Sequence, residues 1–172
     1  MTTTLKDSMN AQKEEVARVI SEAFAGVTLG DGFDLWWGQV LDDWSTPESI
    51  ANYRANHEST VERLDWRRIL VEDLYECHSS LSFFDAAGMR FHLPAFLLAE
   101  LRGEMDNSAV FSLTYLCHND TLDDFDKKQF ATLDAKQRMA VRAFLLYAKD
   151  DPNHEFDRPS IEKALSEYWV AV

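Results

Sequence analysis

The sequence predicts one mainly helical domain of the α+β class, with a small antiparallel sheet in its middle. Over several stretches, apolar residues recur at the three- and four-residue spacing of a helix face. Residues 81–93 and 111–115 change to a shorter period, which is typical of half-buried strands. Helices, then a small sheet, then helices is the order of elements expected of an α+β protein.

The helices are predicted from apolar spacing together with capping residues. Asp134 and Gln137 have capping-box spacing, as do Ser45 and Glu48. Gly103 stands where a helix C-terminal glycine belongs. On this basis we expect helices over residues 10–25, 33–41, 47 to the low sixties, 68–77, 94–102, 135–149 and 159–169. The single domain spans residues 1–172, and its first residues, 1–8, are expected to be flexible.

A β-hairpin is predicted over residues 81–93, where two apolar stretches flank a short Ala-Ala-Gly segment. A three-residue loop with a left-handed Gly88 would form a turn with a bulge and pair Phe83 with Phe91. A two-residue loop would instead place Phe83 opposite Arg90, so the apolar pattern selects the longer loop. Six residues are expected to be almost fully buried: Val19, Phe83, Phe91, Phe96, Leu97 and Phe144.

Composition and charge narrow the classes of function. The 172 residues are 46% hydrophobic, as in ordinary globular proteins, and their formal net charge is −13. Such an excess of carboxylates opposes binding to nucleic acid and to anionic membranes. It favours either a basic partner or simply solubility, since an acidic surface can also be only a solvated surface. Without an N-terminal apolar segment or a long apolar run, the sequence predicts a cytoplasmic protein with reduced thiols.

Three stretches resemble a family of uncharacterised bacterial proteins. The central run LSFFDAAGMRFHLPAF, residues 81–96, looks like the signature of that family. The run QRMAVRAFL, residues 137–145, is similar to its C-terminal helix, and AFAGVTLG, residues 23–30, to its opening. The resemblance implies a bacterial source and a domain of unknown function, and it supplies no catalytic residues.

Neither a metal nor another cofactor is predicted, although cysteine and histidine are neighbours at Cys77-His78 and Cys117-His118. Adjacent residues diverge on a strand or a helix, and zinc knuckles leave two to four residues between their ligands. Buried structural cysteines are the favoured interpretation.

One candidate polar site lies on the predicted hairpin, where Arg90 and His92 would share a face and Asp85 would start the turn. Such a face suits anion binding or acid–base chemistry. The alternative interpretation is structural, with Asp85 initiating the turn and Arg90 packing on Phe84.

The leading functional hypothesis is a non-catalytic binding protein, most plausibly an acidic immunity or inhibitor protein that covers a toxin or effector. It depends on the small size, the acidity and the absence of a catalytic motif. Two carboxylate clusters are the candidate contact residues for a basic partner: Asp120, Asp123, Asp124, Asp126, Asp150, Asp151 and Glu155. The alternatives are an enzyme or small-molecule sensor that uses the Arg90/His92 face, and self-association through the aromatic last helix.

Overall fold

Every regular element that the structure describes is a helix. The structure is a computed structural model, and it describes the backbone of residues 2–106, 108–115 and 124–170. Since no strand occurs within these ranges, the α+β prediction and its antiparallel sheet are wrong. The elements are α1 (Thr2–Ala23), α2 (Leu35–Asp42), α3 (Pro47–Asn56), η1 (Trp66–Arg68), α4 (Val71–Glu76), η2 (His78–Ser82), α5 (Ala86–Arg102), α6 (Ser108–Tyr115), α7 (Asp124–Gln129), α8 (Ala135–Asp150), η3 (Pro152–His154) and α9 (Arg158–Glu167).

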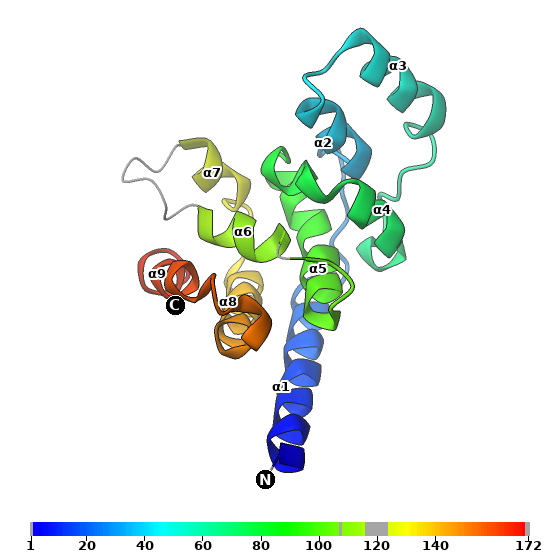
Figure 1. The fold of residues 1–172 in the computed structure, drawn as a ribbon. Helices are drawn as coiled ribbons and strands as arrows, with labels where there is room; N and C mark the ends of the chain where they lie inside the picture. The colour runs from blue at the N-terminus through cyan, green and yellow to red at the C-terminus, as the bar shows by residue number, and fades with distance from the viewer. Residues whose placement is uncertain (1, 107, 116–123, 171–172) are drawn as a thin grey trace.

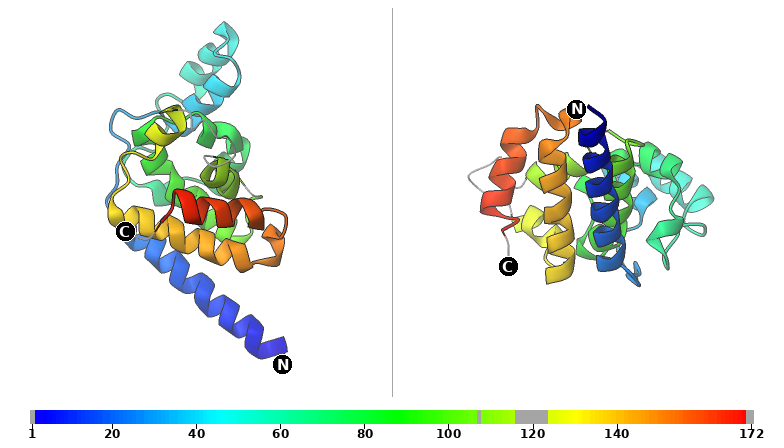
Figure 2. Two further views of the ribbon diagram at one scale, coloured as in Figure 1. Left: turned by 90° about the vertical axis from the view of Figure 1, so that its left-hand side faces the viewer. Right: turned by 90° about the horizontal axis from the view of Figure 1, so that it is seen from below.

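Helix α5 is the centre of the molecule. Helices α1, α4, α6, α7 and α8 and the short η1 all pack against it, while α8 also packs on α1 and α9. Helix α2 packs on η2, and α3 packs on α2. Figures 1 and 2 show α2 and α3 together as an arm that extends away from the rest of the molecule. We call residues 35–56 the α2–α3 arm.

The predicted hairpin, residues 81–93, comprises the end of η2, the turn before α5 and the N-terminal half of α5. Asp85 caps this helix by accepting a hydrogen bond from the backbone N–H of Gly88 at 2.7 Å. All residues from Phe91 to Leu101 are buried, because neighbouring elements surround α5. A helix that is apolar on all sides shows no stripe, and a short apolar run cannot be assigned to helix or strand from its period. The sequence therefore lacked the signal that would have identified residues 86–93 as part of α5.

We expected Pro94 to open a helix, but it lies inside α5. Proline has no backbone N–H, and inside a helix it costs about 3 kcal/mol relative to alanine. Tertiary packing around α5 must offset this cost. The predicted C-terminus is correct: Gly103 caps α5 with a φ of 74°, a left-handed conformation that glycine adopts without strain.

Gly88 is required for close packing and not for a left-handed turn. A Cβ atom at this position would collide with the backbone oxygen of Phe33 and would lie 2.9 Å from Asp85 Oδ1. Asp85 Oδ1 also accepts a hydrogen bond from the Phe33 backbone N–H, at 3.1 Å. The segment before α2 is thus held directly against the first turn of α5.

Replacing Gly88 by alanine should lower the free energy of unfolding by about 1–3 kcal/mol, as overpacking does. The loss should occur although alanine favours a helix interior over glycine by about 1 kcal/mol. Chemical denaturation measures it, and Glu162→Ala on the exposed side of α9 is the control, with a change within about 0.5 kcal/mol. A Gly88→Ala variant as stable as the wild type would contradict this close approach.

Two further elements differ from the prediction. The helix that starts at Pro47 ends at Asn56, short of the low sixties, and its N-cap is Thr46 and not Ser45. Residues 111–115 belong to helix α6 and not to a strand. In α6 the buried residues are Ala109, Val110, Leu113 and Thr114, which follow helical spacing, while Phe111 and Tyr115 are exposed.

The amphipathic helices follow the prediction more closely. Helix α8 has the predicted capping box between Asp134 and Gln137, and Pro159 lies in the first turn of α9. Gly26 follows α1 with a φ of 74°. Helix α1 is longer than expected, since it begins at Thr2 and includes residues that the sequence analysis assigned to a flexible segment.

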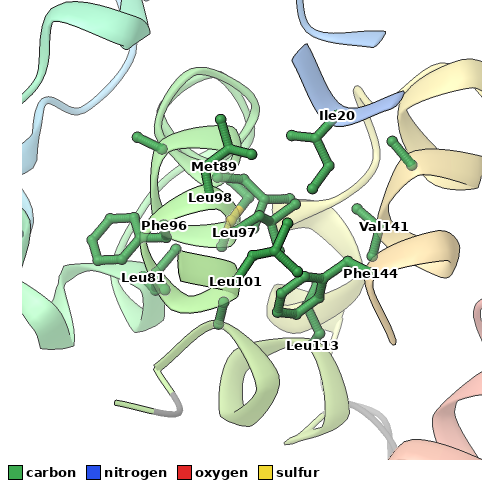
Figure 3. Close-up of a cluster of buried hydrophobic side chains, with 14 of the residues drawn as sticks. Ile20, Leu81, Met89, Phe96, Leu97, Leu98, Leu101, Leu113, Val141 and Phe144 are labelled. Carbon is green, nitrogen blue, oxygen red and sulfur yellow. The ribbon is translucent and has the colours of Figure 1, made fainter. Parts of the chain in front are cut away.

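The core forms around α5. Figure 3 shows Met89, Phe96 and Leu97 of this helix among side chains from η2, α1, α6 and α8. Four of the six expected core residues, Phe91, Phe96, Leu97 and Phe144, are almost fully buried, as predicted. Val19 and Phe83 are only partly buried.

Candidate functional site

The three residues of the predicted hairpin site do not form one face. Asp85 caps α5, while Arg90 donates a hydrogen bond from Nε to Gln137 Oε1 at 3.1 Å. His92 is buried and stacks on Phe84, with ring centroids 4.5 Å apart. Two residues apart on a helix, Arg90 and His92 point in nearly opposite directions. The prediction that Arg90 and His92 share a polar face was wrong because it required a strand.

His92 nevertheless lines a pocket, which we call the His92 pocket. It has a volume of about 330 Å³ and lies between the α2–α3 arm, α4 and α5. Its lining combines aromatic, apolar and charged side chains: Leu35, Trp36, His57, Thr60, Val61, Glu62, Arg68, Ile69, Leu70, Asp73 and His92.

The protonation of His92 is fixed by its surroundings. Nδ1 lies 2.8 Å from the backbone oxygen of Gly88, and because a carbonyl only accepts, Nδ1 carries the proton. Nε2 is therefore an acceptor, and no described residue donates to it. Burial lowers the pKa of His92 to about 4, so the ring is neutral near pH 7.

Nε2 of His92 has no donor among the described residues, and the His92 ring lines the pocket. Among the described residues, every buried side-chain nitrogen or oxygen has a hydrogen-bond partner. An Nε2 without a partner is consequently accessible, even though the side chain as a whole is only 1% exposed. Since His92 is one of the residues that line the pocket, we assign the accessible edge of its ring to this space.

The pocket also contains one carboxylate without a counterion. Asp73 on α4 is half-buried, and no described residue forms a hydrogen bond or an ion pair with its carboxylate. Burial and the neighbouring Glu76 and Glu72 raise its pKa, while His57 lowers it. The other pocket carboxylate, Glu62, is engaged by the backbone N–H groups of residues 64 and 65 and by Arg68, at 3.4 Å.

Trp36 and His57 form an aromatic wall of the same pocket. Their rings are stacked, with centroids 3.7 Å apart and planes inclined by 16°. Trp36 comes from α2, and His57 is the C-cap of α3, so this contact joins the two helices of the arm. The contact between His57 and Trp36 was not predicted from the sequence.

A second cavity, of about 590 Å³, contains a buried glutamate beside a buried histidine. Both oxygens of Glu100 accept backbone N–H groups of α6, from Ala109 at 2.7 Å and Val110 at 3.2 Å. His154 Nε2 lies 3.9 Å from Glu100 Oε1, and its Nδ1 lies 3.4 Å from Asp157. Burial raises the pKa of Glu100 to about 8, although the two N–H donors lower it. The role that this geometry assigns to Glu100 is to cap α6.

The predicted acidic clusters lie only partly within the described residues. Asp120 and Asp123 lie outside them, and Asp124 and Asp126 belong to α7 without a described side chain. In the second cluster, Asp150 and Glu155 are exposed at the end of α8 and after η3, and Asp151 caps η3. Between Glu155 and Asp157 stands Phe156, whose side chain is 96% exposed.

The turn between α2 and α3 combines three unusual features. Trp44, in this turn, is 91% exposed. Trp44 and Ser45 have φ angles of 61° and 49°, a left-handed conformation that is uncommon for residues other than glycine. Carboxylates border the tryptophan at Asp42, Asp43 and Glu48. We call residues 42–48 the arm tip. The sequence analysis missed it, because neither exposure nor a left-handed turn was visible from spacing.

We still interpret the cysteines of the two cysteine–histidine pairs as structural residues and not as metal ligands. Cys77 is buried, His78 is exposed, and Cys117 and His118 lie outside the described residues. In the part of the chain that the structure describes, no three histidine, cysteine, aspartate or glutamate side chains gather as metal ligands do. Within the same part, no helix is both long and apolar enough to cross a bilayer.

The described residues thus define a helical protein with an acidic, tryptophan-bearing arm and two polar cavities. A family model described as a family of unknown function (DUF6714) matches residues 12–172, and the chain belongs to this family. No curated protein and no solved structure matches the chain.

Proposed function

We propose that this protein is a non-catalytic binding protein that contacts a basic protein partner through the arm tip. The observation that carries the proposal is Trp44, 91% exposed in a left-handed turn between two helices. Such a conformation costs about 1–3 kcal/mol for a residue other than glycine, and strain of this kind concentrates at ligand clamps and switch regions.

Burial of Trp44 by a partner would recover a large free energy. Burying an aromatic side chain contributes roughly 1.5–3 kcal/mol, and tryptophan is enriched among residues that dominate binding energy. The Trp44 side chain is 91% exposed on a turn of the helix pair that packs on the body through α2. The arm tip therefore has the properties of a central anchor in an interface.

The charge around Trp44 indicates a basic partner. Asp42, Asp43 and Glu48 surround the tryptophan in the sequence, and no lysine or arginine occurs between Arg18 and Arg54. With a net charge of −13 on the whole chain, the field favours approach of a positive surface. Electrostatic complementarity of this kind mainly accelerates association.

The narrower form of the proposal is a bacterial immunity or inhibitor protein that acts in the cytoplasm by covering a basic toxin or effector. The small size and the acidic character support it. A gene for a toxin directly beside the gene for this protein, whose product binds the purified chain, would be the expected finding. A neighbouring product that does not bind would remove this narrower form and leave the general proposal.

Replacing Trp44 by alanine should weaken partner binding by about 30-fold or more, corresponding to about 2 kcal/mol at a dominant interface residue. Wild type, Trp44→Ala and Phe156→Ala serve as parallel baits in the source cell extract, followed by titration of the captured basic protein. Phe156 is the matched control, since it is equally exposed and also flanked by carboxylates. Loss of binding in Phe156→Ala with retention in Trp44→Ala would move the contact to the second acidic cluster.

Two further measurements sharpen this test. Changing Asp42, Asp43 and Glu48 to their amides should slow association, and the effect should shrink as salt rises. The same change at Asp120, Asp123 and Asp124 tests the acidic segment that the sequence predicted. Sedimentation must show a monomer for the wild type; a dimer that Trp44→Ala dissociates would mean that a second copy, and not a basic partner, covers the tip.

A further inference from the structure

The His92 pocket has the chemistry of a cation site, and its walls belong to elements that are distant in the sequence. Trp36 comes from α2, His57 from the end of α3, Asp73 from α4 and His92 from α5. The pocket volume of about 330 Å³ is in the range of small-molecule sites, which begins at roughly 300 Å³.

Unused acceptors face this space. The lone pair of His92 Nε2 accepts no hydrogen bond from a described residue, although the side chain is almost fully buried. The Asp73 carboxylate likewise has no partner among these residues. Thr60 Oγ1 donates to backbone oxygens of residues 56 and 57, so its lone pairs are available as well.

The positive charge in the lining does not satisfy these acceptors. Arg68 is the cation that lines the pocket; it is largely exposed and its Nε lies 3.4 Å from Glu62 Oε2. Arg63, the nearby cation that interacts with His92, donates instead to Asp34 and to the Gly30 backbone oxygen. Asp73 therefore has no hydrogen bond or ion pair among the described residues; His57 lowers its pKa, while Glu72 and Glu76 on the same helix raise it and increase the negative potential.

We infer that the His92 pocket binds a compact organic cation, a primary ammonium or a guanidinium group, between the Asp73 carboxylate, His92 Nε2 and the Trp36–His57 wall. The N–H groups of the cation donate to Asp73 and His92, which removes two unsatisfied acceptors at once. A cation also gains from contact with an aromatic face, by about 0.5–2 kcal/mol. An anion would instead meet an unpaired carboxylate and a lone pair.

This inference does not depend on the arm tip or on a protein partner. The cation has two chemical sources, a free small amine or guanidine and the side chain of a lysine or arginine in a peptide. Both sources place the same group against Asp73 and His92. The experiment below separates them.

The test is a titration of the full chain with four probes of similar size, followed by NMR. Butylammonium and ethylguanidinium are the cations, butanol is the neutral probe and butyrate the anion. The nitrogen resonances of the His92 ring and the Trp36 indole report on the pocket directly. We expect the cations to cause a saturable shift of the His92 and Trp36 nitrogen resonances. The His92 Nε2 signal should change as its lone pair accepts a hydrogen bond from the cation.

A matched pair of variants on α4 makes the result specific. Asp73→Asn should weaken cation binding about tenfold or more, the effect of losing a hydrogen bond to a charged group. Glu72→Gln removes the same charge one residue away, from an exposed position, and should change affinity by less than about twofold. Thermal melting of both variants confirms that each is folded before the titration.

A second titration, with a capped pentapeptide that carries one central lysine, identifies the source of the cation. Binding of the peptide at the same resonances, with butylammonium as competitor, assigns the site to a protein side chain. Binding of the free cations alone assigns it to a small metabolite. The inference is overturned by equal shifts with butyrate or butanol, by unchanged affinity in Asp73→Asn, or by the absence of a saturable shift with either cation.

Discussion

Replacing Glu100 by alanine is expected to lower the free energy of unfolding by about 3 kcal/mol, because two buried donors lose their acceptor. The backbone N–H groups of Ala109 and Val110 both donate to this carboxyl group, and both residues are fully buried. Denaturant unfolding measures the loss. Glu104→Ala, on an exposed glutamate after the same helix, is the control and should change stability by less than about 0.5 kcal/mol.

The stability contributed by Glu100 should also depend on pH. Burial raises its pKa in the folded protein to about 8, above the ordinary value of 4.5. A group whose pKa is raised on folding contributes fully below its unfolded pKa and loses this contribution as pH rises through the folded value. The wild type should therefore lose stability between about pH 4.5 and 8 relative to Glu100→Gln, which does not titrate. Parallel pH profiles of the two proteins would contradict the raised pKa.

Truncating Phe144 to alanine should cost about 3–5 kcal/mol, the range for large aromatic residues in a packed core. Phe144 projects from α8 into the cluster around α5, close to Leu97, Leu101 and Leu113 in Figure 3. Leu146→Ala is the matched control on the same helix, because its side chain is partly exposed and should cost about 1 kcal/mol or less. Chemical denaturation of both variants gives the comparison.

A loss below about 1 kcal/mol for Phe144→Ala would mean that the face of α8 assigned to the core is wrong. Equal losses for Phe144→Ala and Leu146→Ala would show that burial does not distinguish the two positions. The difference between them is thus the quantity that tests the packing of α8 on α5.

A third functional interpretation, self-association through the last helix, has a structural alternative. Trp169 and Tyr168 after α9 lie in an intramolecular aromatic cluster with Phe130, at centroid distances of 5.3 and 6.4 Å. Trp169 Nε1 donates to the Leu113 backbone oxygen, and Arg138 covers both rings at 4.9 Å. These aromatic residues pack within the chain, which accounts for their presence without a second copy.

The sequence by itself determined the helices whose signals are local. A capping box, an apolar stripe and a following break define α8, and Gly103 ends α5 for reasons that act within a few residues. It also determined the acidic character and the membership in a family of unknown function over residues 12–172. Neither depends on how the chain folds.

The tertiary structure decided the rest. Helix α5 is apolar on all sides because it is surrounded, so its sequence carries no helical stripe, and its N-terminal half, residues 86–93, was assigned to a hairpin. The roles of three candidate residues differ for the same reason. Asp85 caps α5, Arg90 donates a hydrogen bond to Gln137, and His92 lines a pocket. The exposure of Trp44 and the absence of an ion-pair partner for Asp73 depend on how the elements pack. Spacing along the chain does not contain such relations, because only packing brings α2, α3, α4 and α5 around one pocket.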